Sequence, residues 1–208
     1  MIAGAAAPAP AQIVKTPNGY LLRVKYVPGQ VVRFETSSSI ANKGTSEPSS
    51  VLKMPITLSV LNVKGGKAYL NLSMGAGVLD GNKVSDPTEV KMSLDDRNQA
   101  DKGPGVPGIG AFPDRPMQAG STWHSGVPIR ALGTLLKVDG VFRFQGMKPT
   151  QNGPLAVISY SLSGGATGTG IMMLMPKDGS IYSNETNLSV SAPDAAIYLI
   201  HMVWKRRM

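Results

Sequence analysis

The chain has 208 residues, a net charge of +8, 42% apolar residues and only 16% charged residues. It contains no cysteine, which excludes disulfides, thiolate metal sites and a cysteine nucleophile within these residues. The positive charge is spread along the sequence and aromatic residues make up 6%, so the basic, aromatic-interleaved stripe typical of nucleic-acid binding is missing. A spread positive charge instead favours weak attraction to anionic surfaces.

The first 18 residues predict a disordered leader. Met1–Gln12 is rich in alanine and proline, and its Ala-x-Ala spacing is one that signal peptidase accepts. We therefore expect either the remnant of an export signal or a flexible Ala/Pro leader. The longest clean apolar stretch, Ile197–Val203, is too short to span a membrane as a helix.

Alternating apolar and polar residues then predict a series of strands, the first over Tyr20–Tyr26 and the second over residues 32–36. Pro28-Gly29 turns the chain between them. Ser37–Ser50 is polar and predicts a long, loose hairpin tip.

A long strand is predicted over residues 52–60, where Pro55 indicates an edge position or a bulge because proline cannot donate to the ladder. Gly65-Gly66 supplies the positive φ angles of a tight hairpin turn, and the partner strand follows over residues 68–72. Residues 84–94 predict a further strand.

The alternation stops at residues 96–120, which are expected to form a long, ordered Gly/Pro-rich loop between a first β half (19–95) and a second (121–208). Asp95–Lys102 predicts one or two helical turns, and Gly103–Gly110 cannot be regular structure. So long a segment without regular structure is either functional or a linker.

The second half predicts strands over residues 122–131, 134–146, 154–163, 168–175, 180–191 and 195–204, with a turn at Lys177-Asp178-Gly179. Val31–Phe34 recurs as Val141–Phe144, through either an internal duplication or chance. The sequence therefore predicts an all-β protein with a strongly curved antiparallel sheet, as a half-barrel or a sandwich.

Three motifs could indicate a binding or catalytic site, but a structural role explains each of them better. Ser163–Gly170 is similar to the glycine-rich turn of dinucleotide-binding folds, but no helix follows and only 38 residues remain, so we expect a hairpin tip. Asp95-Asp96 is interpreted as a solvated turn rather than an acid–base pair, because neighbouring strand residues face opposite ways. His201 shares one face of a C-terminal strand with Ile197, Leu199 and Val203 and is expected to be a core histidine.

His124 has no acidic residue near it in the sequence, and no Gly-x-Ser-x-Gly elbow occurs. We accordingly predict no catalytic residue, no bound cofactor and no metal site. Two other groups of residues are binding candidates. Adaptable methionine and leucine side chains could line an apolar ligand site, namely Met54, Leu58, Leu72, Met172 and Leu174. The C-terminal Trp204, Lys205, Arg206 and Arg207 combine an aromatic ring with three cations, which suits a membrane surface or an acidic partner.

Two segments of the sequence resemble uncharacterised exported bacterial β proteins and lipoproteins. The first is Phe112–Trp123, and the second runs from Asn152–Tyr160 through a glycine-rich tip to Asp178–Ile181. The resemblance covers roughly residues 20–35 and 110–190, and it implies a curled antiparallel sheet like those of periplasmic lipid carriers. Its motifs are structural and carry over no catalytic residue. The chain departs from the lipoprotein members because it holds no cysteine for a lipid anchor.

The leading functional hypothesis is a non-enzymatic, extracytoplasmic protein that acts as a structural or scaffolding subunit at a membrane surface or in a larger assembly. Its partners would be proteins or an anionic membrane surface, with lipid as a further candidate and nucleic acid excluded. The alternative is a periplasmic carrier of an apolar, lipid-like ligand. A third hypothesis is a hydrolase that uses His124 with a nearby serine.

Overall fold

The computed structural model describes residues 13–44, 49–102, 105–106, 109–131, 134–151, 153–191 and 196–207, with the backbone alone at 130, 131, 134 and 135. Every regular element in these ranges is a β-strand. None of the described residues belongs to a helix long and apolar enough to cross a membrane. The leader residues 1–12 lie outside the described ranges.

Fifteen strands follow one another in the part of the chain that the structure describes. They are β1 (Ile13–Thr16), β2 (Gly19–Leu22), β3 (Val31–Asn42), β4 (Ser50–Lys64), β5 (Lys67–Met74), β6 (Gly77–Leu79), β7 (Asn82–Ser85), β8 (Thr88–Leu94), β9 (Ala100–Lys102), β10 (Thr122–Ala131), β11 (Thr134–Lys148), β12 (Leu155–Gly164), β13 (Thr167–Leu174), β14 (Ile181–Ser191) and β15 (Ile197–Arg206).

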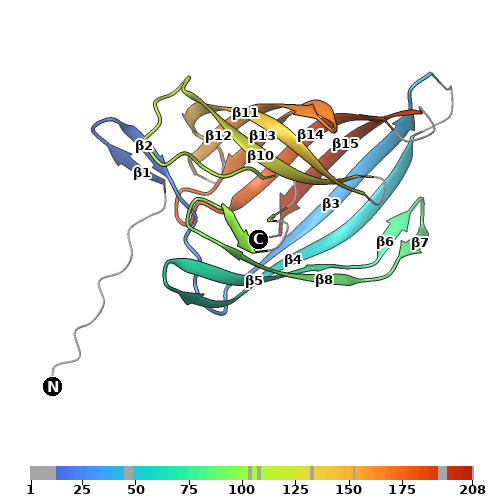
Figure 1. Ribbon diagram of the computed structural model, residues 1–208, viewed down its shortest axis with the longest axis horizontal. Coiled ribbons are helices and arrows are strands. Elements are labelled where there is room, and N and C mark those ends of the chain that lie inside the picture. Colours follow the sequence, from blue (N-terminus) through green and yellow to red (C-terminus); the bar gives the residue numbers. More distant parts are fainter. Residues whose placement is uncertain are drawn as a thin grey trace.

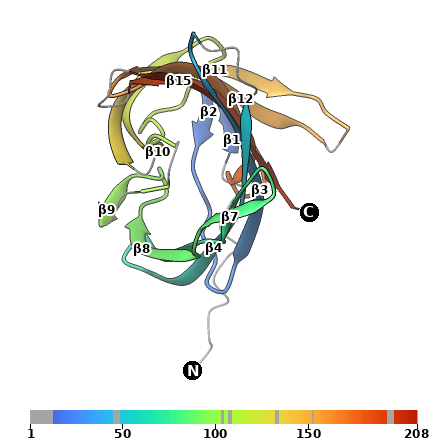
Figure 2. The ribbon, with the colours of Figure 1, turned by 90° about the vertical axis from the view of Figure 1, so that its right-hand side faces the viewer.

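Thirteen of these strands form one antiparallel sheet (Figure 1). Its main path runs β10-β11-β12-β13-β14-β15-β3-β4-β5-β8-β9, and the β6–β7 hairpin is attached to β4. Because β15 pairs with β3, the two halves of the sequence belong to the same sheet. The sheet curls until its two ends, β9 and β10, lie on the same side of the molecule without pairing (Figure 2). The predicted all-β fold with a curved antiparallel sheet is therefore confirmed, as a single open sheet.

Two predicted turns are confirmed. Gly65 and Gly66 join β4 to β5 between the paired residues Lys64 and Lys67, and their φ angles are +60° and +75°. Two consecutive positive φ angles match the right-handed twist of the flanking strands, which is why this pair of glycines makes a tight hairpin. Ser163–Gly170 contains the tip of the β12–β13 hairpin, as expected.

The first predicted strand is wrong in its bounds. Residues 13–16 and 19–22 form a separate two-stranded hairpin, so residues 13–18 are not a disordered leader. After Leu22 the chain leaves the hairpin because its backbone bonds to other segments. The Val24 amide donates to the Asp96 carbonyl (2.6 Å), and the Lys25 amide donates to the Asp178 carbonyl (2.7 Å).

Ser37–Ser50 is also not a loose hairpin tip. β3 continues to Asn42 because residues 37–40 have a neighbour on each side, β15 and β4, and residues 41 and 42 still pair with β15. Residues 45–48 of the predicted tip lie outside the described ranges. Pro55 lies in the interior strand β4, at the point where its neighbour changes from β5 to β6. The Pro55 carbonyl there accepts a hydrogen bond from the Gly75 amide (2.8 Å). Neither β5 nor β6 pairs with residue 55, so no neighbouring carbonyl on that side needs a backbone N–H from it. Position 55 is therefore a local edge of the sheet, where a proline is tolerated.

Two further predictions need correction. The single strand over 84–94 is two strands, β7 and β8, separated at Asp86-Pro87. The helical turns expected over Asp95–Lys102 are a tight turn followed by the short strand β9. In contrast, all six strands of the second half are confirmed, with bounds that differ by a few residues.

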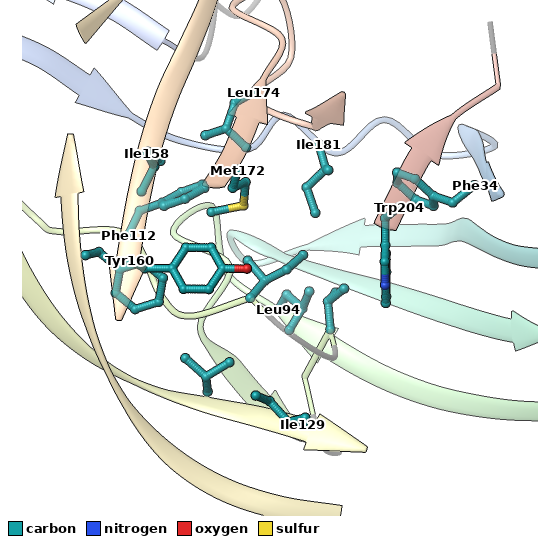
Figure 3. Close-up of a cluster of buried hydrophobic side chains, with 14 of the residues drawn as sticks. Phe34, Leu94, Phe112, Ile129, Ile158, Tyr160, Met172, Leu174, Ile181 and Trp204 are labelled. Atoms are coloured by element: carbon teal, nitrogen blue, oxygen red, sulfur yellow. The ribbon is translucent and has the colours of Figure 1, made fainter. Parts of the chain in front are cut away.

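The concave side of the sheet holds the hydrophobic core (Figure 3). Phe34 of β3 and Phe144 of β11 are both buried in the core. The recurring Val-x-x-Phe motif therefore has the same orientation in each half of the sequence. The duplication itself stays a prediction. Phe142 stacks on Trp123 at 5.3 Å between ring centroids and contacts Tyr160 at 5.5 Å, while Phe34 contacts Trp204 at 5.9 Å.

Candidate functional site

The two unpaired ends of the sheet border an open cleft of about 1030 Å³. We call it the seam cleft. Its walls are residues of the β8–β9 turn and β9, residues of β10, and the segment that connects the two strands. They are Arg97–Ala100, Gly105, Ile109, Ala111–Arg115, Thr122–Gly126 and Pro128.

Residues 109 and 111–115 line the seam cleft. They belong to the segment of residues 109–117, here called the strap. Its apolar side chains Ile109, Phe112 and Met117 are buried in the core together with Val106, although the strap itself belongs to no strand. The described part of the Gly/Pro-rich connection therefore contributes to the core of a sheet that both halves share. Three buried apolar residues within nine positions are the signal that sequence reasoning overlooked.

Hydrogen bonds attach the strap to both ends of the sheet. The Phe112 amide donates to the Arg97 carbonyl in the β8–β9 turn (2.7 Å). On the other side, the Ala111 amide donates to Ser125 Oγ of β10 (2.8 Å), and Trp123 Nε1 donates to the Ala111 carbonyl (3.0 Å). The strap thus bridges the gap between two strands that do not pair with each other.

Arg23 fixes the outer end of the strap. Its guanidinium donates to the Pro113 carbonyl (2.8 Å) and to the Asp114 carbonyl (3.0 Å), and its Nε lies 3.4 Å from Asp96 Oδ2. This one side chain therefore connects the segment after β2, the strap and the β8–β9 turn. Nothing in the sequence near Arg23 indicates this role, because its partners lie more than 70 residues away.

The β8–β9 turn is organised by Asp95. Its Oδ1 accepts hydrogen bonds from the amides of Arg97 (2.9 Å) and Gln99 (2.8 Å), and its Oδ2 lies 3.5 Å from Arg97 Nε. Asp95-Asp96 is thus a turn, as predicted, in which Asp95 caps the backbone. Asn98 in the same turn has a φ of +63°, a conformation that asparagine tolerates better than most residues.

Tyr26 lies beneath this turn and donates a hydrogen bond from its hydroxyl to Asn98 Oδ1 (3.1 Å). Burial, and to a lesser extent the negative charges of Asp95 and Asp96, raise the pKa of the Tyr26 hydroxyl well above its usual range. A phenolate is unfavourable in this position, so Tyr26 acts here as a neutral hydrogen-bond donor.

The structure does not bring His124 together with a serine. His124 is exposed on the outer side of β10, whereas Ser125 faces the strap and its Oγ accepts the Ala111 amide. His201 is not a core histidine. It lies on the outer face of the sheet with Leu199, and its Nδ1 is 2.8 Å from Asn187 Oδ1. Among the described residues, no group of three His, Asp or Glu side chains could hold a metal ion.

The five predicted apolar lining residues are divided between different places. Leu58 and Leu72 line a cavity on the concave side, here called the inner cavity, together with Phe34, Ile181 and Trp204. Met172 and Leu174 are buried in the core beside it, and Met54 packs only partly buried against the core elsewhere. The inner cavity measures about 40 Å³, room for a water molecule, so it would hold a lipid chain only after side chains that line it had moved aside.

The four C-terminal residues do not form one exposed contact patch. Trp204 is only 8% exposed and packs on Phe34. Arg206 also turns inward, where its guanidinium donates to Ser180 Oγ (2.5 Å) and lies 3.5 Å from Asp178. Lys205 and Arg207 face outward, and Arg207 pairs with Glu35. Alternation along β15 separates the four residues into an inner and an outer pair.

The comparisons with other proteins leave the family open. No protein-family model matches the sequence, and no curated protein matches it. One similar solved structure is a Bacteroides fragilis protein with a YmcC-like fold that is inferred to be exported. The match covers 89% of this chain and 100% of that chain, with 11% sequence identity and a TM-score of 0.43. Similarity at this level assigns neither a fold family nor a function to the chain.

Proposed function

We propose that the protein is an exported, non-enzymatic subunit that binds a protein partner through the seam cleft, at a membrane surface or within a larger assembly. The observation that carries the proposal is the open sheet, whose two unpaired end strands border a cleft of about 1030 Å³. Unpaired strand edges are templates on which an extended segment of another chain can pair.

The register of β10 shows which of its backbone groups are available. The Phe144 amide bonds to the Ser121 carbonyl (3.0 Å), and bonded pairs alternate along an antiparallel ladder, so the odd-numbered residues of β10 bond to β11. The backbone groups of Thr122, His124 and Gly126 then point to the free edge. Pro128 has the same parity and, having no N–H, ends this row of donors.

The side chains around this edge suit recognition of a partner. Arg115 and His124 are exposed and Trp123 is partly exposed, a combination of arginine and aromatic residues that is enriched in protein interfaces. The net charge of +8 favours an acidic partner or an anionic membrane surface close by.

Native mass spectrometry tests the proposal. The protein would be isolated gently from its own cells, with membrane and soluble fractions kept separate. We expect a defined multiprotein mass, which should disappear in His124→Pro because the variant loses an outward N–H. His124→Ala keeps that N–H and should keep the complex, so the pair separates backbone pairing from side-chain contact. A wild-type monomer in both fractions contradicts the proposal.

A further inference from the structure

The strap separates two spaces of different character. The seam cleft lies on its outer side and the inner cavity on its inner side, and both are lined by Asn98, Ile109 and Phe112. The walls of the inner cavity are otherwise mostly aliphatic and aromatic, including Phe34, Leu72 and Trp204. If Ile109 and Phe112 moved outward, the two spaces would become continuous and a channel would lead from the seam to the core.

Asn98 contributes an unused hydrogen-bond donor at this boundary. The residue is only 7% exposed, and its Oδ1 accepts the Tyr26 hydroxyl at 3.1 Å. Its Nδ2 is buried and has no hydrogen-bond partner among the described residues. A buried amide without an acceptor is unfavourable, and native structures rarely retain one without a reason. A ligand oxygen placed beside Asn98 would supply the missing acceptor.

We propose that the space behind the strap is a binding site for a single acyl chain that ends in a carbonyl or carboxylate oxygen. The chain enters through the seam cleft, takes the place of the Ile109 and Phe112 side chains, and lies against Phe34, Leu72 and Trp204. Asn98 Nδ2 donates to its terminal oxygen. A flexible acyl chain suits this space better than a rigid ring system, because it can pass between the strap and the sheet.

The strap can move without breaking the sheet. Its backbone hydrogen bonds to described backbone groups are the isolated bridge between Met117 and Tyr20, the bond from Phe112 to the Arg97 carbonyl, and the bond from Ile109 to the nearby Val106 carbonyl. The remaining attachments are made by the side chains of Ser125, Trp123 and Arg23. Outward movement of Ile109 and Phe112 therefore breaks a few hydrogen bonds and no strand pairing.

Binding of radiolabelled palmitate, measured by equilibrium dialysis on the full chain, tests this inference. We expect saturable binding at one site per chain. The double variant Ile109→Ala/Phe112→Ala removes the side chains that compete for the space and should bind at least tenfold more tightly. Aspartate tolerates the same backbone conformation as asparagine but has no side-chain N–H donor. The Asn98→Asp variant should therefore bind palmitate at least tenfold more weakly. Met54→Ala, an apolar truncation outside the cavity, should leave the affinity unchanged.

Hydrogen exchange provides a second measurement that does not depend on the Asn98 variant folding. Palmitate should accelerate amide exchange at Ala111 and Phe112 as the strap moves outward. Equal binding of palmitate and 1-palmitoylglycerol supports recognition of a carbonyl oxygen, and binding of palmitate alone supports a free carboxylate. No binding to the wild type or to the double variant overturns the inference. This result would leave partner binding at the β10 edge unaffected, because that is measured without an acyl ligand.

Discussion

Gly170 offers a sharp test of how the interior is packed. It lies in β13 between Tyr160 of β12 and Thr186 of β14 in the register of the sheet. The Tyr160 ring crosses over the glycine, and its hydroxyl reaches Thr186 Oγ1 (2.5 Å) and Asn184 Oδ1 (2.7 Å). A Cβ atom at position 170 would lie 2.3 Å from Tyr160 Cζ and 2.6 Å from the Glu185 carbonyl oxygen.

We expect Gly170→Ala to be strongly destabilising. Overpacking a core costs about 1–3 kcal/mol. Displacing the Tyr160 hydroxyl leaves the buried groups of Asn184 and Thr186 without a partner, at a further cost of about 1–3 kcal/mol. The free energy of unfolding should therefore fall by at least about 2 kcal/mol, and the Tm by at least about 4 °C for a chain of this size.

The matched control is Gly126→Ala in β10. No atom lies within 4 Å of a Cβ built at Gly126, so the added methyl group meets open space. The control should change the free energy of unfolding by less than about 1 kcal/mol, in the stabilising direction. Urea denaturation followed by tryptophan fluorescence measures both variants, because Trp204 is buried in the core. Equal stabilities of the two variants would refute the proposed contact between Tyr160 and Gly170.

Three further predictions concern the ion pairs, the alkaline limit of stability and a turn. Arg206→Gln should lower the free energy of unfolding by about 1–3 kcal/mol, since Arg206 and Asp178 are mostly buried, at 18% and 17% exposure. Arg207→Gln should cost less than about 1 kcal/mol, since its pair with Glu35 is exposed, and urea midpoints compare the two. The pKa of Tyr26 is raised by folding, so its contribution to stability is complete below about pH 10 and is lost as the pH rises further. Midpoints between pH 8 and 11 should thus fall less steeply in Tyr26→Phe than in the wild type; equal slopes would contradict the burial of a neutral Tyr26. Gly66→Ala should cost about 1 kcal/mol because φ is +75° there, and Gly66→Asn should cost less, which thermal unfolding measures.

The expected functional sites show where sequence reasoning is weakest. His201, Leu199 and Val203 alternate correctly along β15, but they face outward, while Ile200 and Trp204 face the core. Both sets are largely apolar, so alternation alone does not reveal which side is inside. The same ambiguity applied to the C-terminal Trp204–Arg207, which alternation divides between the two faces of the sheet.

Local sequence determined the class of the fold and most of its strands. Period-two patterns and glycine turns such as Gly65-Gly66 are local signals, because they depend on the φ angles and side-chain directions of neighbouring residues. The tertiary structure alone decided that β15 pairs with β3, that β9 and β10 remain unpaired, and that the strap enters the core. These features depend on contacts between residues far apart in the chain, as when Arg23 holds the carbonyls of Pro113 and Asp114. The alternation of apolar and polar residues along one strand does not indicate which distant segment will pair with it or pack against it.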